Sequence, residues 1–287
     1  MKNIIVPIDF SDESINGLRM AIIIANKFKS RVQMVYVQKL PSEVGRVGLD
    51  EEHKKVTQAF KKLTGEYAKK MHDSKMLDFI IKKGKIYREV VNQAQAFENS
   101  LVICSTHGAS GFEEFFIGSN AFKIISASDI PVITIRHGSV ARDISTIVMP
   151  IDVSNDTRQK VPITALIANA FNAEVHVLGL TTTNSEEVES KVTSYCNQAC
   201  EYLKDHGVKF KFETRKTSSI TTETIEYALD VKADLVSIMT EQNENLADFV
   251  LGTLAQQMLN KSPIPVLSIT PKEIFIMGTF RTSGAPY

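Results

Sequence analysis

The chain has 287 residues, of which 43% are hydrophobic and 23% are charged, and its 33 basic residues are balanced by 33 acidic ones. This composition is typical of a globular protein of one or two domains, and the neutral balance argues against a nucleic-acid-binding surface. The longest apolar runs, such as residues 21–25, are too short to span a bilayer, which needs about 20 residues, so no membrane association is predicted.

The first residues, MKNIIVP, enter a predicted strand without the apolar region of a signal peptide. Three cysteines form an odd and sparse set, which fits a reducing compartment better than a disulfide framework. We therefore expect a cytoplasmic protein. Cys196 and Cys200 lie one helical turn apart near His206, and this spacing favours one face of a helix over a metal site.

Short β-branched runs bounded by turn residues predict five strands in the first half of the chain, at residues 3–8, 32–37, 77–81, 101–104 and 132–135. Capping residues at 11–14 precede a helical stripe, and residues 50–72 predict a second, charged helix. The apolar stripe of that helix contains Val56, Phe60, Leu63, Tyr67 and Met71. Near-continuous apolar strands that alternate with helices predict an α/β fold with a mostly parallel sheet covered on both faces.

The second half of the chain repeats the first in the same order. IIVPIDFS at residues 4–11 recurs as IVMPIDVS at 147–154, and the apolar runs at 101–103 and 129–135 recur at 235–238 and 263–269. Gly118-Ser119 recurs as Gly252-Thr253. The sequence therefore predicts two tandem domains, 1–137 and 145–271, with a linker at 137–143. A tail, residues 272–287, lies outside both repeats, and its apolar residues predict a contact with the first domain or a neighbouring subunit.

Residues 105–120, STHGASGFEEFFIGSN, place a glycine-containing loop between a predicted strand and a helix that would begin near Gly118. Free backbone amides at such a loop, with the positive end of a helix dipole, are suited to bind phosphate. Ligands of open α/β sheets bind where the strand order reverses, beyond the carboxyl ends of the strands. If the first and fourth strands flank that reversal, Asp9 and the loop converge on a nucleotide. The structural alternatives are that Asp9 only caps the first helix and that the glycines only form turns.

These motifs resemble the universal stress protein family in its tandem form, over nearly the whole chain. The resemblance is carried by VPIDFS at 6–11, by the strand end at 35–37 and by Ser105 to Ser119, which follows the spacing G-x2-G-x9-G-[ST] of ATP-binding members except that Ser105 replaces the first glycine. It implies that each domain is a doubly wound, five-stranded parallel sheet of order 3-2-1-4-5.

Position by position, the resemblance implies a nucleotide site in the first domain. Asp9 would lie on the ribose or adenine side, and Pro7, Ile8 and Val37 would line the adenine pocket. The phosphates would be held by the motif residues, namely Ser105, Gly108, Gly118, Ser119 and Asn120. A serine at 105 adds a side chain where a glycine would permit close approach or unusual backbone angles. The expected cofactor is ATP, with or without Mg²⁺.

The second domain departs further from the pattern. Met239 and Gln242 stand in place of the two motif glycines, and Glu241, Glu244 and Asp248 make the loop acidic, which would repel phosphates. Asp152 is retained, and Leu180 takes the place of Val37. We therefore expect that only the first domain binds ATP in the family's way.

Three functions follow from these observations. The first is a nucleotide-binding stress-response module that acts as a sensor or regulator through an unknown protein partner. The alternatives are a nucleotide-free interaction scaffold and, less favoured because no P-loop or general base is evident, a slow ATPase. The resemblance also implies that the last strands of the two domains pair within the chain to form a pseudo-dimer, with a homodimer as the alternative assembly.

Overall fold

A computed structural model describes residues 1–38, 46–106, 118–136, 143–240 and 251–272 of the chain. The first half contains β1 (Asn3–Pro7), α1 (Asp12–Phe28), β2 (Arg31–Gln38), α2 (Arg46–Tyr67), β3 (Leu77–Lys83), α3 (Ile86–Gln95), β4 (Ser100–Ser105), α4 (Ser119–Ala127) and β5 (Val132–Ile135). The second half contains β6 (Thr146–Ile151), α5 (Val161–Phe171), β7 (Glu174–Thr181), α6 (Glu186–Asp205), β8 (Lys209–Lys216), α7 (Ile220–Asp230), β9 (Leu235–Met239), α8 (Thr253–Lys261) and β10 (Val266–Ile269).

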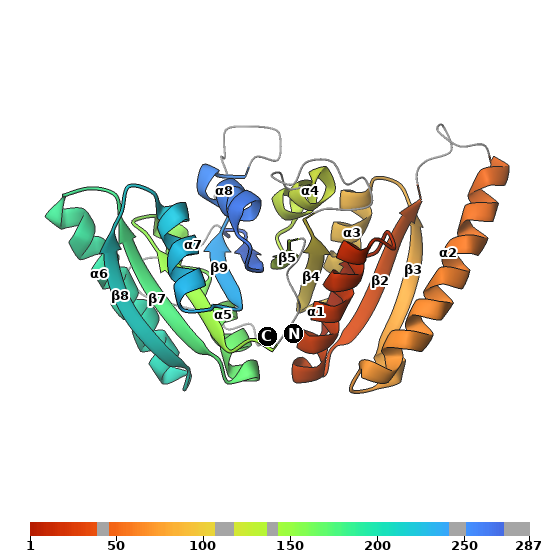
Figure 1. Cartoon of the computed structure of the whole chain (residues 1–287), viewed down its shortest axis with the longest axis horizontal. Helices are drawn as coiled ribbons and strands as arrows, with labels where there is room; N and C mark the ends of the chain where they lie inside the picture. The colour runs from red at the N-terminus through yellow and green to blue at the C-terminus, as the bar shows by residue number, and fades with distance from the viewer. Residues whose placement is uncertain (39–45, 107–117, 137–142, 241–250, 273–287) are drawn as a thin grey trace.

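The ten strands of the described residues form one sheet in the order β3-β2-β1-β4-β5-β10-β9-β6-β7-β8 (Figure 1). Within each half the pairs are parallel, and β1 lies between β2 and β4 just as β6 lies between β7 and β9. Each half therefore has the order 3-2-1-4-5 implied by the family resemblance. The strand order reverses at β1 and at β6, because the chain moves outward from these strands first to one side and then to the other.

The two halves meet through an antiparallel pairing of β5 with β10, in which Thr134 lies opposite Val266. Beside this seam the Thr270 hydroxyl donates a buried hydrogen bond of 2.6 Å to the Ser128 carbonyl oxygen. At its edge the Lys27 ammonium lies 3.1 Å from the Asp143 carboxylate. The structure thus contains the internal pairing of last strands that a pseudo-dimer requires.

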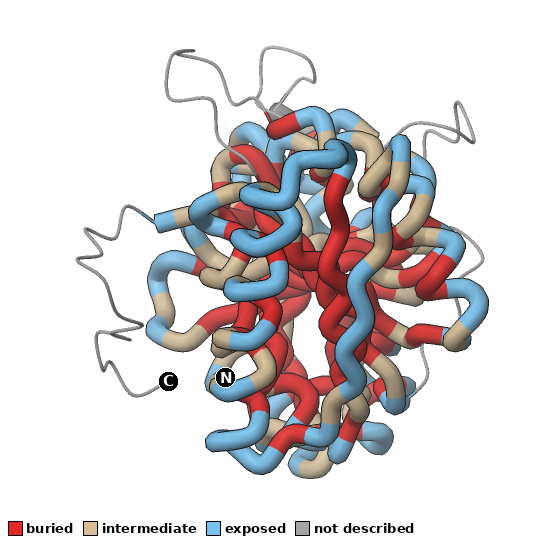
Figure 2. The backbone as a smooth tube through the Cα atoms, turned by 90° about the vertical axis from the view of Figure 1, so that its left-hand side faces the viewer, coloured by how far each residue is buried: buried red, intermediate tan, exposed pale blue. Residues whose placement is uncertain are grey.

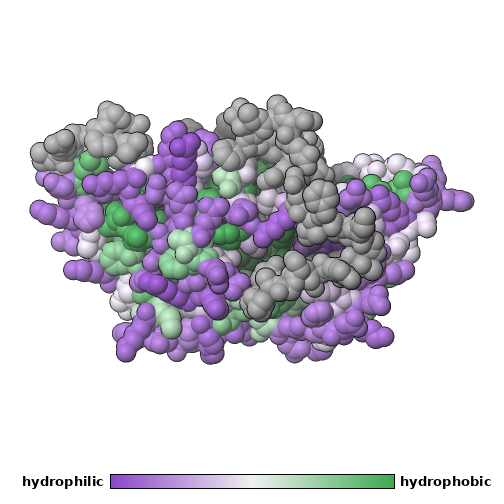
Figure 3. All heavy atoms as spheres, turned by 180° about the vertical axis from the view of Figure 1, so that it is seen from behind, coloured by the Kyte–Doolittle hydropathy of each residue, from purple (hydrophilic) through white to green (hydrophobic). Residues whose placement is uncertain are grey.

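Helices cover both faces of the sheet. One buried cluster joins it to α1, α2, α5 and α6, and the other joins it to α3, α4, α7 and α8. Buried residues occupy the middle of the molecule in Figure 2, with exposed residues around them. On the face seen in Figure 3, apolar residues form small groups separated by hydrophilic ones. Among the described helices, none is long and apolar enough to cross a membrane.

Two element boundaries differ from the sequence prediction. The helix predicted at 50–72 begins at Arg46 and ends at Tyr67, and two short 3-10 turns, Ala68–Lys70 and Ser74–Met76, follow it. Met71, the last residue of the predicted stripe, is nevertheless buried. Apolar spacing therefore identified Met71 as buried but did not indicate the change of helix type that precedes it.

The first helix of the second half, α5, begins later in its repeat than the equivalent helix of the first half. Its counterpart α1 begins at Asp12, after Ser11 caps it by accepting a hydrogen bond from the Ser14 amide. In the second half a 3-10 turn, Asn155–Arg158, precedes α5, which has Pro162 in its first turn. Proline has no amide hydrogen and is favoured at the start of a helix, so Pro162 is compatible with this later start. As a result Lys160 becomes the residue that flanks the helix start.

We expect the Thr270→Val variant to lower the free energy of unfolding by about 1–3 kcal/mol, because it leaves the buried Ser128 carbonyl without its donor. Urea denaturation of the full chain measures the change. Thr270→Ser keeps the hydroxyl and serves as the matched control. Equal destabilisation by both variants would show that the methyl group, and not the hydrogen bond, matters at the seam.

Candidate functional site

The site predicted in the first half lies where the strand order reverses. β1 ends at Pro7 and β4, its neighbour, ends at Ser105. Beyond these ends, the Ile8 amide donates to the Val35 carbonyl at 2.9 Å and the Gly118 amide donates to the Thr106 carbonyl at 2.5 Å. The second bond brings the start of α4 beside the end of β4. The carboxyl ends of two adjacent strands and one helix N-terminus are therefore gathered at one edge of the sheet.

Asp9 follows β1 and is exposed at this edge. Its Oδ1 atom accepts hydrogen bonds from the Ser11 amide at 3.0 Å and the Ser11 hydroxyl at 2.5 Å. Ser11, and not Asp9, caps α1. The capping role considered for Asp9 is thus taken by its neighbour, while Asp9 holds that neighbour in place through one carboxylate oxygen.

Phe10 has a backbone φ of 66°, which is rare for a bulky residue. Such angles cost on the order of 1–3 kcal/mol and persist where the surrounding packing imposes them. The Phe10 ring centroid lies 4.9 Å from that of Phe60 and 5.8 Å from that of Tyr36, contacts that hold the ring in place. The turn directly after Asp9 is therefore strained, a feature that no sequence motif indicates.

A second polar group missed by the sequence lies on β2 and α2. The Tyr36 hydroxyl donates to Glu52 Oε1 at 2.7 Å, and the Gln38 amide donates to Glu52 Oε2 at 3.2 Å. Burial raises the pKa of Tyr36 to about 12, and the Glu52 hydrogen bond and the charges of Glu52 and Asp9 act in the same direction. Tyr36 therefore stays a hydrogen-bond donor at neutral pH.

The remaining predicted residues are not all brought together. Ile8 is buried in the cluster under α1 and α2, whereas Val37 packs against the cluster on the opposite face. The two side chains therefore do not line one common wall. Pro7 is partly buried at the end of β1.

The predicted phosphate-binding residues lie at the ends of β4 and α4. Ser105 is the last residue of β4 and its φ is not positive, so the strand accepts a serine without backbone strain. Gly118 flanks the start of α4, and Ser119 and Asn120 are exposed in its first turn. Gly108 lies outside the described residues.

The second half contains a small cavity at the equivalent position. Its lining has an apolar part, formed by Pro150, Ile220, Ile238, Met239 and Leu254, and a polar part, formed by Asp152, Ser154, Thr157 and Lys160. In the repeat, Pro150, Asp152, Met239 and Leu254 correspond to Pro7, Asp9, Ser105 and Asn120. Asp152 Oδ1 accepts from the Ser154 amide at 3.0 Å and hydroxyl at 2.5 Å, as Asp9 does from Ser11. Two polar positions of the first half have thus become apolar. The loop residues Glu241, Gln242, Glu244 and Asp248 lie outside the described part of the chain.

Lys160 occupies the repeat position of Gly17 and is only 2% exposed. Its ammonium donates to the Thr157 carbonyl at 2.5 Å and to the Thr157 hydroxyl at 3.1 Å. Burial lowers the pKa of Lys160 to about 8, against the opposing effect of the Asp152 charge. The first half has no side chain at this position.

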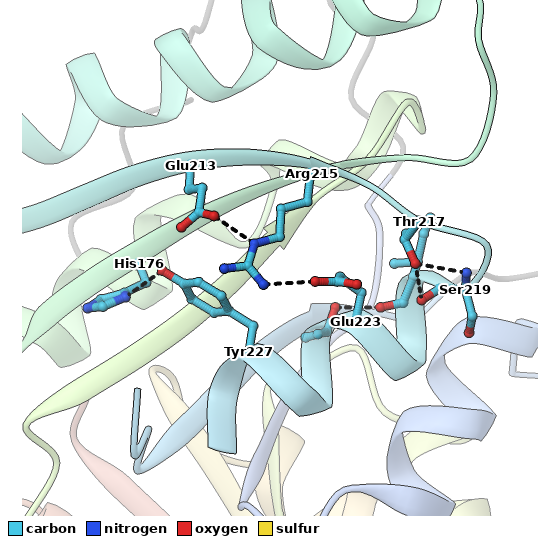
Figure 4. Close-up of polar contacts among 9 residues, drawn as sticks. His176, Glu213, Arg215, Thr217, Ser219, Glu223 and Tyr227 are labelled. Atoms are coloured by element: carbon cyan, nitrogen blue, oxygen red, sulfur yellow. Dashed lines mark hydrogen bonds and ion pairs between the residues drawn. The ribbon is translucent and has the colours of Figure 1, made fainter. Parts of the chain in front are cut away.

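A second polar cluster in this half resembles a catalytic relay (Figure 4). The His176 ring lies 2.9 Å from the Tyr227 hydroxyl and 3.0 Å from Glu174, while Arg215 pairs with Glu213 and Glu223. His176 and Tyr227 are both buried between β7 and α7. At the repeat positions of His176 and Tyr227, Gln93 donates to Gln33 at 2.6 Å. A polar pair of either kind joins helix to sheet there, so we assign the cluster a structural role.

Among the described residues, no group of three or more His, Cys, Asp or Glu side chains is placed to hold a metal ion. Cys196 is buried on α6, Cys200 is partly buried one turn later, and neither forms a disulfide. His206 flanks the end of α6, where its ring stacks on Tyr202. Their positions fit the helix-face interpretation of these residues.

The family model described as the universal stress protein family matches residues 1–136 and 144–269. The chain belongs to the universal stress protein family. A universal stress protein of Methanocaldococcus jannaschii is 29% identical over 145 residues, 47% of this chain and 82% of that protein.

Solved universal stress proteins share the fold. A crystal structure from Archaeoglobus fulgidus has a TM-score of 0.71 at 14% identity, covering 93% of this chain and 98% of that one. A shorter universal stress protein solved in complex with cAMP is 20% identical and covers 45% of this chain and 98% of its own, with a TM-score of 0.39. The two matches of the family model, one in each half, make the present chain a tandem universal stress protein.

We expect the stability of this universal stress protein to depend on the charge of Lys160. The pKa of about 8 in the folded chain is below the value of about 10.4 for a solvated lysine, so the folded state releases its proton first as pH rises. Between pH 7 and pH 10 the free energy of unfolding of the unmodified chain should therefore rise by about 2 kcal/mol more than that of Lys160→Met. This figure follows from about 1.4 kcal/mol for each unit by which the pKa is lowered.

Urea denaturation at a series of pH values measures this difference. Lys209→Met, which removes an exposed lysine, is the control and should run parallel to the unmodified chain at every pH. If Lys160→Met also runs parallel to it, the ammonium is solvated and its pKa is not lowered.

Proposed function

We propose that this universal stress protein binds ATP or an AMP-type nucleotide through its first domain, residues 1–137, and acts as a stress-response sensor or regulator. The observation that supports this most directly is that Asp9 and the start of α4 lie at the same edge of the sheet, where the strand order reverses. A carboxylate suited to ribose hydroxyls and a helix N-terminus suited to phosphate stand at the same edge of the sheet.

The groups present fit such a ligand. Asp9 is an exposed carboxylate at this edge, oriented by the two hydrogen bonds that its Oδ1 accepts from Ser11, and carboxylates are suited to accept from ribose hydroxyls. No side chain among the described residues caps α4, so its first amide groups are suited to phosphate oxygens. Asn120 and Ser119 add side-chain donors in the same turn. A bound Mg²⁺ would rely mainly on phosphate oxygens, because the described residues offer no carboxylate cluster.

The second domain, residues 145–271, offers a different environment. Met239 and Leu254 replace two polar residues at the strand and helix ends, and Lys160 is one of the residues that line the cavity there. We propose that nucleotide binding is confined to the first domain and that ligand occupancy there is communicated to a protein partner. An interaction scaffold without nucleotide is the alternative that the following experiment separates.

Isothermal titration with ATP tests the proposal on the full chain. One site per chain is expected, and Asp9→Asn should weaken it roughly 10- to 100-fold, because an amide nitrogen cannot accept the ribose hydroxyl and hydrogen bonds to charged groups contribute about 1.5–3 kcal/mol. Asn retains an oxygen for the Ser11 contacts, so thermal stability should change little. The matched variant Asp152→Asn should bind ATP like the unmodified chain. No binding at millimolar ATP by the folded protein would instead favour the scaffold.

Ser105 should limit the affinity of this site. We expect Ser105→Gly to tighten ATP binding by roughly three- to tenfold, on the order of 1 kcal/mol, because the phosphates could approach the end of β4 more closely. Ser105→Val should weaken it, since it keeps the bulk and adds a methyl group. Unchanged affinity in both variants would place the phosphates away from β4. The same titration measures each effect.

A further inference from the structure

The two ends of the sheet differ in how far they are exposed. β3 ends the sheet in the first half and β8 ends it in the second, on the side of the molecule that faces the viewer in Figure 2. In β3 only Lys83 is exposed, whereas every residue of β8 except Phe210 and Arg215 is exposed. Among the strands that the structure describes, none pairs with the outer side of β8. β8 is therefore an open edge, at which another strand can add to the sheet.

An aromatic ring lies exposed in the middle of this edge strand. Phe79 of β3 stacks on Phe60 of α2, with ring centroids 4.6 Å apart. Phe212 has the equivalent position in β8 and is 41% exposed. The buried residues of α6, the helix that packs on β8, are all smaller than phenylalanine, namely Val192, Cys196, Ala199 and Leu203. A ring that is packed under a helix in the first half is thus left in solvent in the second.

The hydrogen bonds of β8 to β7 determine which of its residues can pair outward. The Thr217 amide, directly after β8, donates to the Thr181 carbonyl at the end of β7 at 2.9 Å. Successive residues of a strand direct their backbone groups to opposite sides, so the odd-numbered residues of β8 bond to β7. The even-numbered residues, among them Phe210, Phe212 and Thr214, direct their N–H and C=O groups outward. These residues would bond to an added strand.

We propose that β8 pairs with β8 of a second copy of this chain, in antiparallel orientation and with the two Phe212 residues opposite each other. Each Lys211 then lies opposite Glu213 of the second copy, so two pairs of opposite charge cross the interface. The side chains of Lys211 and Glu213 are 64% and 45% exposed, and both are accessible to such a contact. The two Phe212 rings lie on the same face of the joined sheet, where each covers the other.

The charges of β8 disfavour the adjacent registers. A register centred on Lys211 places two lysines opposite each other, and one centred on Glu213 does the same with two glutamates. Natural edge strands use charges in this way to prevent unselective pairing. In the proposed register the only like-charged residues of β8 that face each other are Lys209 and Arg215, and the charge of Arg215 is already offset by Glu213 and Glu223. The charge pattern therefore selects for this pairing.

Charge reversal tests the proposal, with the dimer dissociation constant of the full chain measured by sedimentation equilibrium. The unmodified chain should dimerise, and Lys211→Glu or Glu213→Lys should each raise the constant about tenfold, because both cross-strand pairs become repulsive. Lys83→Glu makes the same change at the opposite end of the sheet and should have no effect. An equimolar mixture of the two β8 variants should restore dimerisation, since each glutamate then faces a lysine. Loss of ion pairs within one chain would not produce that recovery.

Three results of this experiment would contradict the proposal. The first is a chain that stays monomeric up to millimolar concentration, and the second is a dimer that neither β8 variant weakens. The third is a dimer weakened by Glu213→Lys alone. That result would indicate a register centred on Thr214, in which Glu213 faces Arg215.

Amide hydrogen exchange followed by NMR tests the pairing at single residues. As the protein concentration rises, exchange should slow at Phe210, Phe212 and Thr214, and it should stay unchanged at Lys211 and Glu213, whose amides already bond to β7. Phe212→Thr should weaken this dependence on concentration with little loss of stability, because the ring is already 41% exposed. A chain that dimerises without slower exchange at Phe212 would use another surface, and the proposal would be wrong.

Discussion

The antiparallel pairing of β5 with β10 is the contact on which the architecture depends. Each strand has only four residues, almost all buried, and each would be an open apolar edge if its half stood alone. Pairing covers both edges and joins two five-stranded sheets into one. Because β1 and β6 sit at equivalent distances from the seam, the two sets of strand ends where ligands are expected are held in a fixed relation.

Interacting side chains lie at the same positions in the two halves, but the residue types at these positions differ. Arg31 pairs with Asp78 across β2 and β3, and the equivalent residues Glu174 and Lys211 pair with the charges exchanged. The Gln33 and Gln93 pair is likewise replaced by His176 and Tyr227, the pair seen in Figure 4. Each site requires two complementary groups that satisfy one another under a helix, and several residue pairs meet that requirement. The row of carboxylate, imidazole and hydroxyl therefore stands where a pair of amides joins helix to sheet in the other half.

Much of the fold could be predicted from the sequence because it depends on local patterns. The five strands of the first half and the start of α4 after Gly118 follow from short apolar runs and turn residues. The positive φ of Phe10 could not be predicted, since it is imposed by packing against Tyr36 and Phe60, which are distant in sequence. Lys160 was missed for another reason: one lysine near a helix start normally lies in solvent. When the repeat alignment is extended into the first helix of each half, Lys160 aligns with Gly17. A lysine in one half at the position of a glycine in the other, close to the strand ends, is a signal that the sequence contains.

The presence of Lys160 is difficult to explain by stability alone. Burying an ammonium carries a desolvation cost, which its two bonds to Thr157 and the charge of Asp152 only partly offset, as the lowered pKa shows. An apolar side chain of the same length would fill the space without that cost, and the neighbouring Met239 and Leu254 show that apolar residues are accommodated at this edge. The first half avoids the cost with a glycine. The second half therefore bears a desolvation cost at a position where the first half, with the same strand order, bears none.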